Sequence, residues 1–518
     1  MARNVRNGRQ QGTRRSAAHA RAAAFDLVIR NGRVCDGTGS PWYRADVGIA
    51  DGRVAEIGAI GGRARRTIDA ARCIVCPGFI DVHTHAEGIV ERPAAENFLR
   101  QGVTTVVAGN CGESAFPVAT LLRRVESAGP AINVATLVGH GEIRRRVMGM
   151  ARRAPTRREL AAMRRLADQA MSEGAVGLST GLFYVPGAYA RVDELVGVSE
   201  VIAAHGGVYA THARSAGGKL FAALREAAAI GRRAGIGVEV SHLKVLHRRG
   251  RTRTDRAARA LAFIAACRDR GIDVTCDVHP YPATYTSLSS VIVPPWVSKG
   301  GELVERLKEA GVRRRIRDRA ASNITWIGGA AKFILANCPA DRSLEGRSLA
   351  EVARVRGRDV VNTALDLIVE GSPSCIFHAL RPDDVSTIVC GENTMIASDA
   401  GVVAAGRTVV HPRYYGTFPR VLREYVREKG LLRLEDAVRK MTAMPAAKFG
   451  LADRGVLKTG MRADVVVFDP RRVAERTTFE TPHAFPVGIR AVMVNGHLAW
   501  NGRAISSRRA GEVIRQGR

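Results

Sequence analysis

Between residues 79 and 400, short apolar segments alternate with helical stretches, and this alternation limits the possible folds more than any other feature of the sequence. Each apolar segment has the length of a buried strand, whereas stretches such as 157–174 and 218–235 have the period of amphipathic helices. Eight such segments predict a (β/α)8 barrel with an insertion, a fold that typically needs about 250 residues. A doubly wound sheet is the alternative, but no glycine-rich phosphate-binding sequence follows the first strand. The strand candidates are 79–85, 103–111, 132–140, 175–181, 207–213, 237–244, 273–280 and 394–400.

One stretch, from about residue 284 to residue 347, interrupts the alternation. It contains Pro294, Pro295 and Trp296, and its charged segment 301–319 has a helical pattern of its own. Because this stretch follows the seventh strand candidate, we expect a lid or subdomain beside the mouth of the barrel. We hypothesise that it gates access to the mouth.

The segments on either side of the predicted barrel have the pattern of small antiparallel sheets. Residues 25–58 contain apolar alternations broken by Asn-Gly and Asp-Gly pairs, which are typical of hairpins. Segments 455–470 and 491–503 have the same character. Two β-rich pieces at opposite ends of a chain can complete one domain. We therefore predict a small β-sandwich domain made of residues 25–76 and 451–505, and a TIM-like barrel over residues 77–450 between them.

The chain is strongly basic, with 79 Lys and Arg against 49 Asp and Glu and a formal net charge of +30. Residues 1–24 and 506–518 are predicted to be basic tails. A basic chain can bind nucleic acid, but no recognised binding motif accompanies the charge, so nucleic acid is not the expected partner. Attraction of anionic small molecules to a positive surface is the interpretation we favour. No feature of the sequence indicates an oligomeric state.

The expected compartment follows from the cysteines and from the apolar segments. A hydrophobic fraction of 46% with 25% charged residues is typical of a globular chain, and no apolar run approaches the roughly 20 residues that cross a bilayer. The nine cysteines are an odd number, and the first 24 residues lack the apolar core of an export signal. We therefore predict a cytoplasmic protein with reduced thiols and no membrane partner. Cys73 and Cys76 form a lone C-x-x-C, which we interpret as two small residues beside a strand.

Side chains that bind metals stand at the C-terminal ends of five strand candidates. In a barrel these ends meet at one rim, where active sites are built. Imidazole nitrogens and thiolates are preferred ligands of Zn²⁺, and a catalytic zinc leaves one position open for water. Any one of these residues is more often structural, but their joint occurrence at one rim predicts a zinc site. They are His83, His85, Cys111, His212, His242 and Asp399.

Several motifs that contain these residues resemble the amidohydrolase superfamily and, more narrowly, the D-aminoacylase (N-acyl-D-amino-acid deacylase) family. The resemblance runs from about residue 25 to residue 503, and the motifs are specific as a set. The short motifs are PGFIDVHTH (77–85), AGNCG (108–112), THARS (211–215), SHLK (241–244) and SDAG (398–401). Three longer stretches are GHGEIRRRVMG (139–149), GLSTGLFYVPGAYA (177–190) and HPRYYGTFPRVLREYV (411–426).

The resemblance implies a ligand set and a reaction. Cys111, His212 and His242 would hold a tightly bound zinc, whereas His83 and His85, with Cys111 as a bridge, would form a second, weaker metal position. Asp399 would be the catalytic acid and base. The reaction would be zinc-dependent hydrolysis of the amide bond of N-acyl-D-amino acids, giving a carboxylate and a free D-amino acid. The preference for the D isomer comes from the resemblance alone.

Three further residues are candidates for binding the N-acyl amino acid substrate. Arg413 lies in the stretch that resembles the carboxylate-binding segment of the family, and a guanidinium can hold a carboxylate through two hydrogen bonds. Tyr281 and Lys244 are expected to help bind or orient the substrate. The segment 277–288 departs from the family pattern, so the preferred acyl group and side chain are not carried over. The segment 83–88 also departs from it, at the weaker metal position.

Two other functions compete with the deacylase. A cyclic amidase of the hydantoinase or dihydroorotase kind would use the same barrel, but many such relatives bridge two metals with a fourth-strand lysine, and residues 174–185 contain none. Cys111 is available to take that place. A metal-free relative that serves as a binding protein is the second alternative, and the complete set of ligand types disfavours it.

Overall fold

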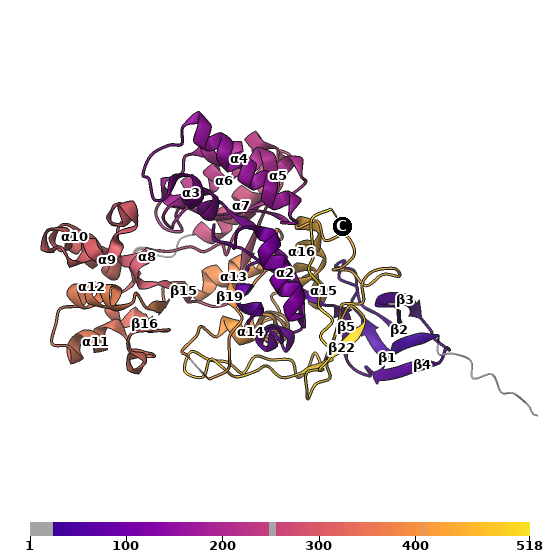
Figure 1. Ribbon diagram of the computed structural model, residues 1–518. Helices are drawn as coiled ribbons and strands as arrows, with labels where there is room; N and C mark the ends of the chain where they lie inside the picture. The colour runs from indigo at the N-terminus through magenta and orange to yellow at the C-terminus, as the bar shows by residue number, and fades with distance from the viewer. Residues whose placement is uncertain (1–23, 248–254, 407, 518) are drawn as a thin grey trace, which may run out of the picture.

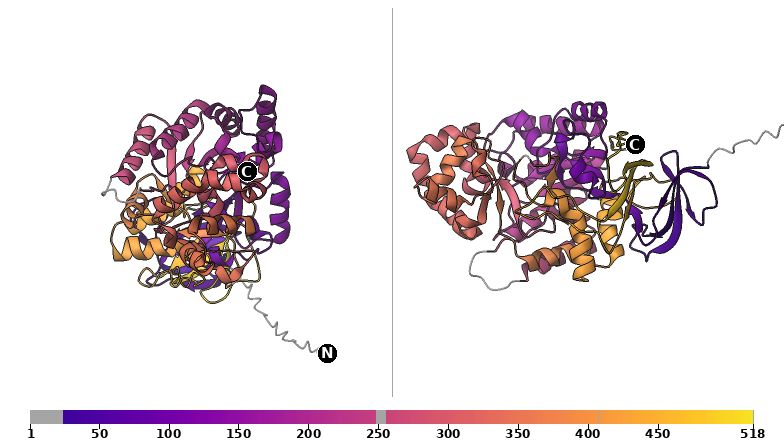
Figure 2. Two further views of the ribbon diagram at one scale, coloured as in Figure 1. Left: turned by 90° about the vertical axis from the view of Figure 1, so that its left-hand side faces the viewer. Right: turned by 90° about the horizontal axis from the view of Figure 1, so that it is seen from below.

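The computed structural model describes residues 24–247, 255–406 and 408–517. The predicted N-terminal tail, residues 1–24, lies outside the described residues except for its last residue. Three parts follow one another along the long dimension of the molecule, as Figure 1 and the right-hand view of Figure 2 show. A helical subdomain lies at one end, a barrel lies in the middle and a β-rich domain lies at the other end (Figures 1 and 2).

The middle part is the predicted (β/α)8 barrel. Its parallel strands form two hydrogen-bonded runs, β6-β8-β9 and β10-β11-β12-β13-β14-β18. Strands β9 and β10 are one strand interrupted at Leu137, and the N–H of Val176 bonds to the carbonyl of Thr136 across that interruption. The N–H of Asp399 bonds to the carbonyl of His83 and closes the ring. The strands are β6 (Phe79–Asp81), β8 (Val103–Ala108), β9 (Asn133–Thr136), β10 (Val138–Gly139), β11 (Gly177–Gly181), β12 (Val208–His212), β13 (Val238–Val240), β14 (Val274–Val278) and β18 (Thr394–Ile396).

Helices cover the outside of the barrel, and α4 (Arg157–Ser172) shows why they form. The Thr156 side chain accepts a hydrogen bond from the N–H of Glu159, whose carboxylate accepts one from the N–H of Thr156. This capping box satisfies backbone donors that the first turn leaves unpaired. Met163, Ala167 and Met171 recur at helical spacing and are buried against the strands. The other covering helices include α2 (Val118–Ala128), α5 (Val192–Ala204), α6 (Leu220–Ala234), α7 (Arg256–Asp269), α13 (Pro382–Cys390) and α15 (Leu434–Met441).

The β-rich domain joins the two ends of the chain. Its eight strands form one sheet in the order β22-β21-β20-β5-β1-β2-β3, with β4 paired to β1. The junction between the two halves is the antiparallel pair of β5 and β20, in which Val467 faces Val75. The strands are β1 (Phe25–Val34), β2 (Tyr43–Ala50), β3 (Arg53–Gly58), β4 (Ala64–Asp69), β5 (Ile74–Pro77), β20 (Val465–Phe468), β21 (Ile489–Val494) and β22 (His497–Trp500).

The insertion is a subdomain with a hydrophobic core of its own, and it extends beyond the predicted end at residue 347. Its antiparallel sheet has the order β15-β17-β16, so β17, which lies after residue 347, is the central strand. Leu288, Phe333, Leu365 and Phe377 belong to its core. The elements are β15 (Thr284–Ser287), α8 (Leu288–Ile292), α9 (Leu303–Lys308), α10 (Ala310–Ile327), β16 (Phe333–Leu335), α11 (Leu349–Val355), α12 (Val360–Glu370) and β17 (Ser374–Phe377).

The segment predicted as a basic C-terminal tail, residues 506–518, is instead attached to the barrel over its described part. The N–H of Val134 in β9 bonds to the carbonyl of Glu512, and the N–H of Ile514 bonds to the carbonyl of Val134. Arg515 forms a 2.7 Å ion pair with Glu126 on α2. Backbone hydrogen bonds, which a charge pattern does not reveal, therefore hold this segment along β9.

The described residues also bear on membrane-spanning helices and on the state of the cysteines. None of their helices combines the length and the apolar character that crossing a bilayer requires. All nine cysteines are free thiols, and all but Cys390 are buried.

Candidate metal centre

Strained backbone at the strand ends aims the candidate ligands. Cys111, His242 and Asp399 have φ angles of 57°, 36° and 53°, in the left-handed region that non-glycine residues rarely adopt. Each stands just beyond the end of a barrel strand, where the chain turns sharply. Such strain persists only where the surroundings fix it, and it concentrates at functional sites. Gly112 shows how crowded this turn is, because a Cβ there would lie 2.6 Å from the backbone nitrogen of Gly181.

The thiol of Cys111 lies among three imidazoles. Its Sγ is 3.4 Å from Nε2 of His83, 3.6 Å from Nδ1 of His212 and 3.6 Å from Nε2 of His242. All four side chains are buried. The structure thus brings together residues that stand at four different strands and that the sequence predicted to meet.

These separations fit a shared tetrahedral zinc ion. Zinc binds sulfur at about 2.3 Å and imidazole nitrogen at about 2.05 Å, so two such ligands of a tetrahedral ion lie about 3.6 Å apart. This is the separation of Cys111 Sγ from the ring nitrogens of His212 and His242. In the described residues, the ligand atoms of His83, Cys111 and His242 also lie within 4.8 Å of one another. The donor set is therefore suited to zinc in both chemistry and spacing.

A second cluster adjoins the first. The ligand atoms of His83, His85 and Asp399 lie within 4.8 Å of one another. Oδ1 of Asp399 is 3.4 Å from Nε2 of His85 and 3.7 Å from Nε2 of His83. His83 thus faces both Cys111 and Asp399. Nearby, Glu87 does not join this cluster, because its carboxylate accepts a 2.8 Å hydrogen bond from the N–H of Gly109.

Asp399 and Arg413 form a buried ion pair beside the imidazoles. Oδ2 of Asp399 lies 2.9 Å from Nη1 of Arg413, which stands at the start of α14 (Arg413–Arg420). Burial alone would raise the pKa of Asp399, but the Arg413 guanidinium and the neighbouring imidazoles hold that pKa well below its ordinary range. The carboxylate is therefore ionised at neutral pH and can accept a proton.

The same balance acts on the thiol and on His83. Burial would raise the pKa of the Cys111 thiol, but the charge on His83 and the hydrogen bonds from three imidazoles hold this pKa well below its ordinary value. Burial would lower the pKa of His83, whereas Asp277 and Cys111 raise it well above its ordinary value. These neighbours favour the thiolate of Cys111, the form that binds metal.

The two remaining substrate-binding candidates are Lys244, which follows a candidate ligand closely in the chain, and Tyr281, which in the described part of the chain does not contact the candidate ligands. Lys244 stands two residues after His242 and is half-buried. Burial lowers the pKa of its ammonium group below the ordinary value, although the negative charges of Asp399 and Cys111 act in the opposite direction. Tyr281 packs behind the site, 4.7 Å from the guanidinium of Arg420 and 5.4 Å from the ring of His411. Within the described residues, no hydrogen bond or ring contact joins Tyr281 to the imidazoles around Cys111.

Three residues at the site have no role in the sequence predictions. Asp277, at the end of β14, has one carboxylate oxygen 3.5 Å from Nδ1 of His83, and the other accepts a hydrogen bond from the N–H of His242. Phe183 and Tyr184 pack on the ring of His212, at centroid distances of 5.7 Å and 4.8 Å. Both lie in the stretch GLSTGLFYVPGAYA (177–190), and its similarity to the family motif was the only sequence feature that could have pointed to them. The hydroxyl of Tyr184 also forms a 3.1 Å hydrogen bond with the hydroxyl of Thr286 in the insertion.

Comparisons with known proteins show which family the chain belongs to. Residues 66–499 match a family described as the amidohydrolase family. D-aminoacylase from Alcaligenes xylosoxydans xylosoxydans is 39% identical over 516 residues, which cover 95% of this chain and 97% of that protein. N-acyl-D-glutamate deacylase from the same organism is 38% identical over 516 residues, with the same coverage of both chains.

A solved structure is similar over nearly the whole chain. It is N-acyl-D-glutamate deacylase from Bordetella bronchiseptica, in complex with zinc and a phosphonate inhibitor that mimics the tetrahedral intermediate of the reaction. The TM-score is 0.81 at 36% identity, covering 95% of this chain and 99% of the other. From this extent of similarity, the chain belongs to the amidohydrolase family and, within it, to the group of D-aminoacylases and N-acyl-D-amino-acid deacylases.

Proposed function

We propose that this protein hydrolyses the amide bond of N-acyl-D-amino acids with the help of bound zinc, releasing a carboxylate and the free D-amino acid. One observation carries the proposal. Three imidazole nitrogens surround the Cys111 sulfur at 3.4–3.6 Å, beside an ionised carboxylate, in a member of the deacylase family. This combination provides both a metal site and a proton carrier, which amide hydrolysis requires.

Cys111, His212 and His242 would hold the tightly bound ion, and His83 and His85 would contribute to a second position. A zinc ion in this site supplies Lewis acidity towards the amide carbonyl and towards water. The side chains of Cys111, His212 and His242 are buried, which keeps bulk water away from them and strengthens the electrostatic interactions around the reacting amide.

Asp399 is the proton carrier in this proposal. As an ionised carboxylate it accepts a proton from the attacking water and later delivers that proton to the nitrogen of the leaving amine. Arg413, at 2.9 Å, keeps the carboxylate ionised before the reaction begins. The backbone bond from the Asp399 N–H to the carbonyl of His83 fixes the carboxylate next to the imidazoles.

Arg413 is also the proposed partner of the substrate carboxylate. Its side chain is buried, and within the described residues its Nε has no hydrogen-bond partner. The guanidinium therefore keeps donors for a second carboxylate after pairing with Asp399. We include Lys244 and Tyr281 as assisting residues, Lys244 through its charge near Asp399 and Tyr281 by packing against His411 behind Arg413.

The test is to assay the purified, zinc-loaded protein against N-acetyl derivatives of D- and L-methionine, D- and L-glutamate and D- and L-aspartate, with release of free amine as the readout. We expect turnover of at least one D compound, little on its L isomer, and loss of turnover after removal of metal. Ring opening of hydantoin or dihydroorotate without cleavage of any linear compound would refute the proposal. Because the nine cysteines are free thiols, we also propose a cytoplasmic location.

A further inference from the structure

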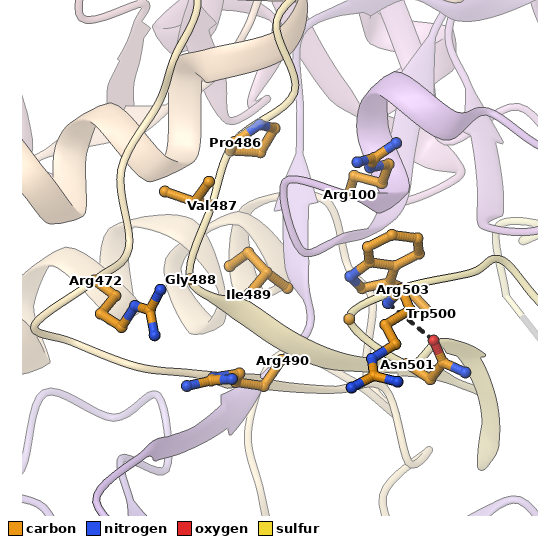
Figure 3. Close-up of a pocket in the computed structure, with 11 residues that line it drawn as sticks. Arg100, Arg472, Pro486, Val487, Gly488, Ile489, Arg490, Trp500, Asn501 and Arg503 are labelled. Carbon is orange, nitrogen blue, oxygen red and sulfur yellow. Dashed lines mark hydrogen bonds between the residues drawn. The ribbon is translucent and has the colours of Figure 1, made fainter.

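A pocket of about 310 Å³, separate from the candidate metal ligands, lies where the β-rich domain meets the barrel (Figure 3). Its walls come from β21, from β22 and from the segment 486–488, with Arg100, the residue after α1 (Glu96–Leu99), at its barrel side. The volume is at the lower end of the range of small-molecule sites. We propose that this pocket binds a small organic anion that carries two or more phosphate or carboxylate groups.

The charge of the lining carries the proposal. Four of the eleven lining residues are arginines, Arg100, Arg472, Arg490 and Arg503, and none is acidic. Arg100 pairs with Glu96 at 2.9 Å, and Arg490 lies 3.7 Å from Asp469. Among the described residues, the side chains of Arg472 and Arg503 have neither an ion-pair partner nor a hydrogen-bond partner. Two guanidinium charges at one pocket are therefore left without compensation by the protein.

The directions of these side chains suit a bound anion. Figure 3 shows Arg472 and Arg490 on one side of the pocket and Arg503 beside Trp500. A guanidinium presents a planar fork of donors that holds phosphate or carboxylate oxygens in pairs. Groups of like charge on opposite sides of one cavity repel each other, and a multivalent anion between them relieves that repulsion.

The wall behind the arginines is fixed by packing. The guanidinium of Arg100 lies 3.7 Å from the ring centroid of Phe485 and 4.7 Å from that of Trp500. Gly502 has a φ of 85°, and a Cβ there would lie 2.9 Å from the carbonyl oxygen of Arg490. Val487, which is 40% exposed, offers an apolar contact for the carbon part of a ligand. A site that is already formed loses little entropy when it binds.

The experiment is calorimetric titration of the full-length, zinc-loaded protein at low salt with two probes. Fructose bisphosphate carries phosphates and tricarballylate carries carboxylates, and free fructose is the uncharged control. The test variant is Arg472→Gln/Arg503→Gln. The matched control is Arg471→Gln/Arg509→Gln, which removes the same charge from exposed arginines that do not line the pocket. Thermal unfolding and deacylase turnover verify that both variants are folded.

In separate titrations, we expect at least one of the two anions, fructose bisphosphate or tricarballylate, to bind with one molecule per chain. Free fructose should not bind. The affinity of the test variant should fall by at least about tenfold, since each lost charge-assisted hydrogen bond is worth at least about that factor. The control variant should bind as the unmodified protein does. Absence of binding of both anions would overturn the proposal directly. Several molecules per chain, or equal weakening in both variants, would also overturn it, because either result would mean that only the overall charge attracts anions.

Discussion

Oδ2 of Asp277 lies 3.5 Å from Nδ1 of His83, on the side of the imidazole ring opposite to the one that faces Cys111. The other carboxylate oxygen of Asp277 accepts a 2.7 Å hydrogen bond from the N–H of His242. One buried carboxylate thus contacts two candidate ligands. A carboxylate charge beside the second nitrogen of a ligand imidazole favours a proton on that nitrogen, and it thereby orients the ring.

We expect Asp277→Asn to weaken metal binding by about 10–100-fold, because the amide replaces an acceptor charge next to His83. The variant should fold, since Asn has nearly the same shape. Competition with a chromophoric chelator measures the zinc affinity. Thr275→Ser, on the same strand, is the control and should bind zinc normally. If Asp277→Asn keeps the original affinity, Asp277 does not position the ligand.

Asp399→Asn tests the proton carrier. We expect this variant to retain its fold and to keep zinc at the Cys111 position, but to lose roughly a hundredfold to ten-thousandfold in kcat, the usual contribution of a positioned acid and base. Metal analysis and steady-state kinetics on an N-acetyl-D-amino acid are the measurements. Turnover equal to that of the unmodified protein would remove Asp399 from this role.

Cys111→Ala tests the sulfur ligand. Replacing the thiolate removes the atom at the centre of the cluster, so the zinc content of the purified variant should fall to a small fraction of one ion per chain. Cys267→Ala, at a buried thiol on α7, is the control and should retain its metal. A Cys111→Ala protein that still holds a full equivalent of zinc at this position would contradict the proposed ligand set.

The barrel and the clustering of the candidate ligands were predictable because both depend on local patterns. Each strand has a run of apolar residues, and one general rule brings the C-terminal strand ends together. This rule placed Cys111, His212 and His242 at one site before any distance was known. In contrast, Asp277 occurs inside a strand candidate, and only the spatial neighbourhood of β14 reveals that its carboxylate meets His83.

The end of the insertion was not predictable for a different reason. The strand β17 is apolar and follows a helix, so its sequence fits the strand–helix alternation of the barrel as well as it fits the small sheet. Its partners β15 and β16, rather than its composition, assign it to the insertion. Pairing between distant segments leaves no mark in a single sequence.

Arg413→Lys tests the substrate carboxylate site. Lysine keeps the charge but loses the planar fork, so kcat/KM for an N-acetyl-D-amino acid should fall by about 10–150-fold, which corresponds to a loss of roughly 1.5–3 kcal/mol in transition-state binding. The corresponding D-amino-acid amide lacks the carboxylate and is the control substrate. We expect the unmodified protein to prefer the acid strongly and the variant to lose most of that preference. An unchanged preference would mean that another residue binds the carboxylate.

Val513→Asp tests the attachment of the C-terminal segment. Val513 forms a bridge to Val134 of β9 and packs partly buried against the barrel core, so a charge there must be taken out of water. We expect the midpoint of unfolding in urea to fall by an amount equivalent to about 1–3 kcal/mol. Arg509→Asp, at an exposed position of the same segment, adds an acidic residue without burial and should leave the midpoint nearly unchanged. If both variants unfold at the midpoint of the unmodified protein, the segment contributes no stability and behaves as the free basic tail that its composition predicts.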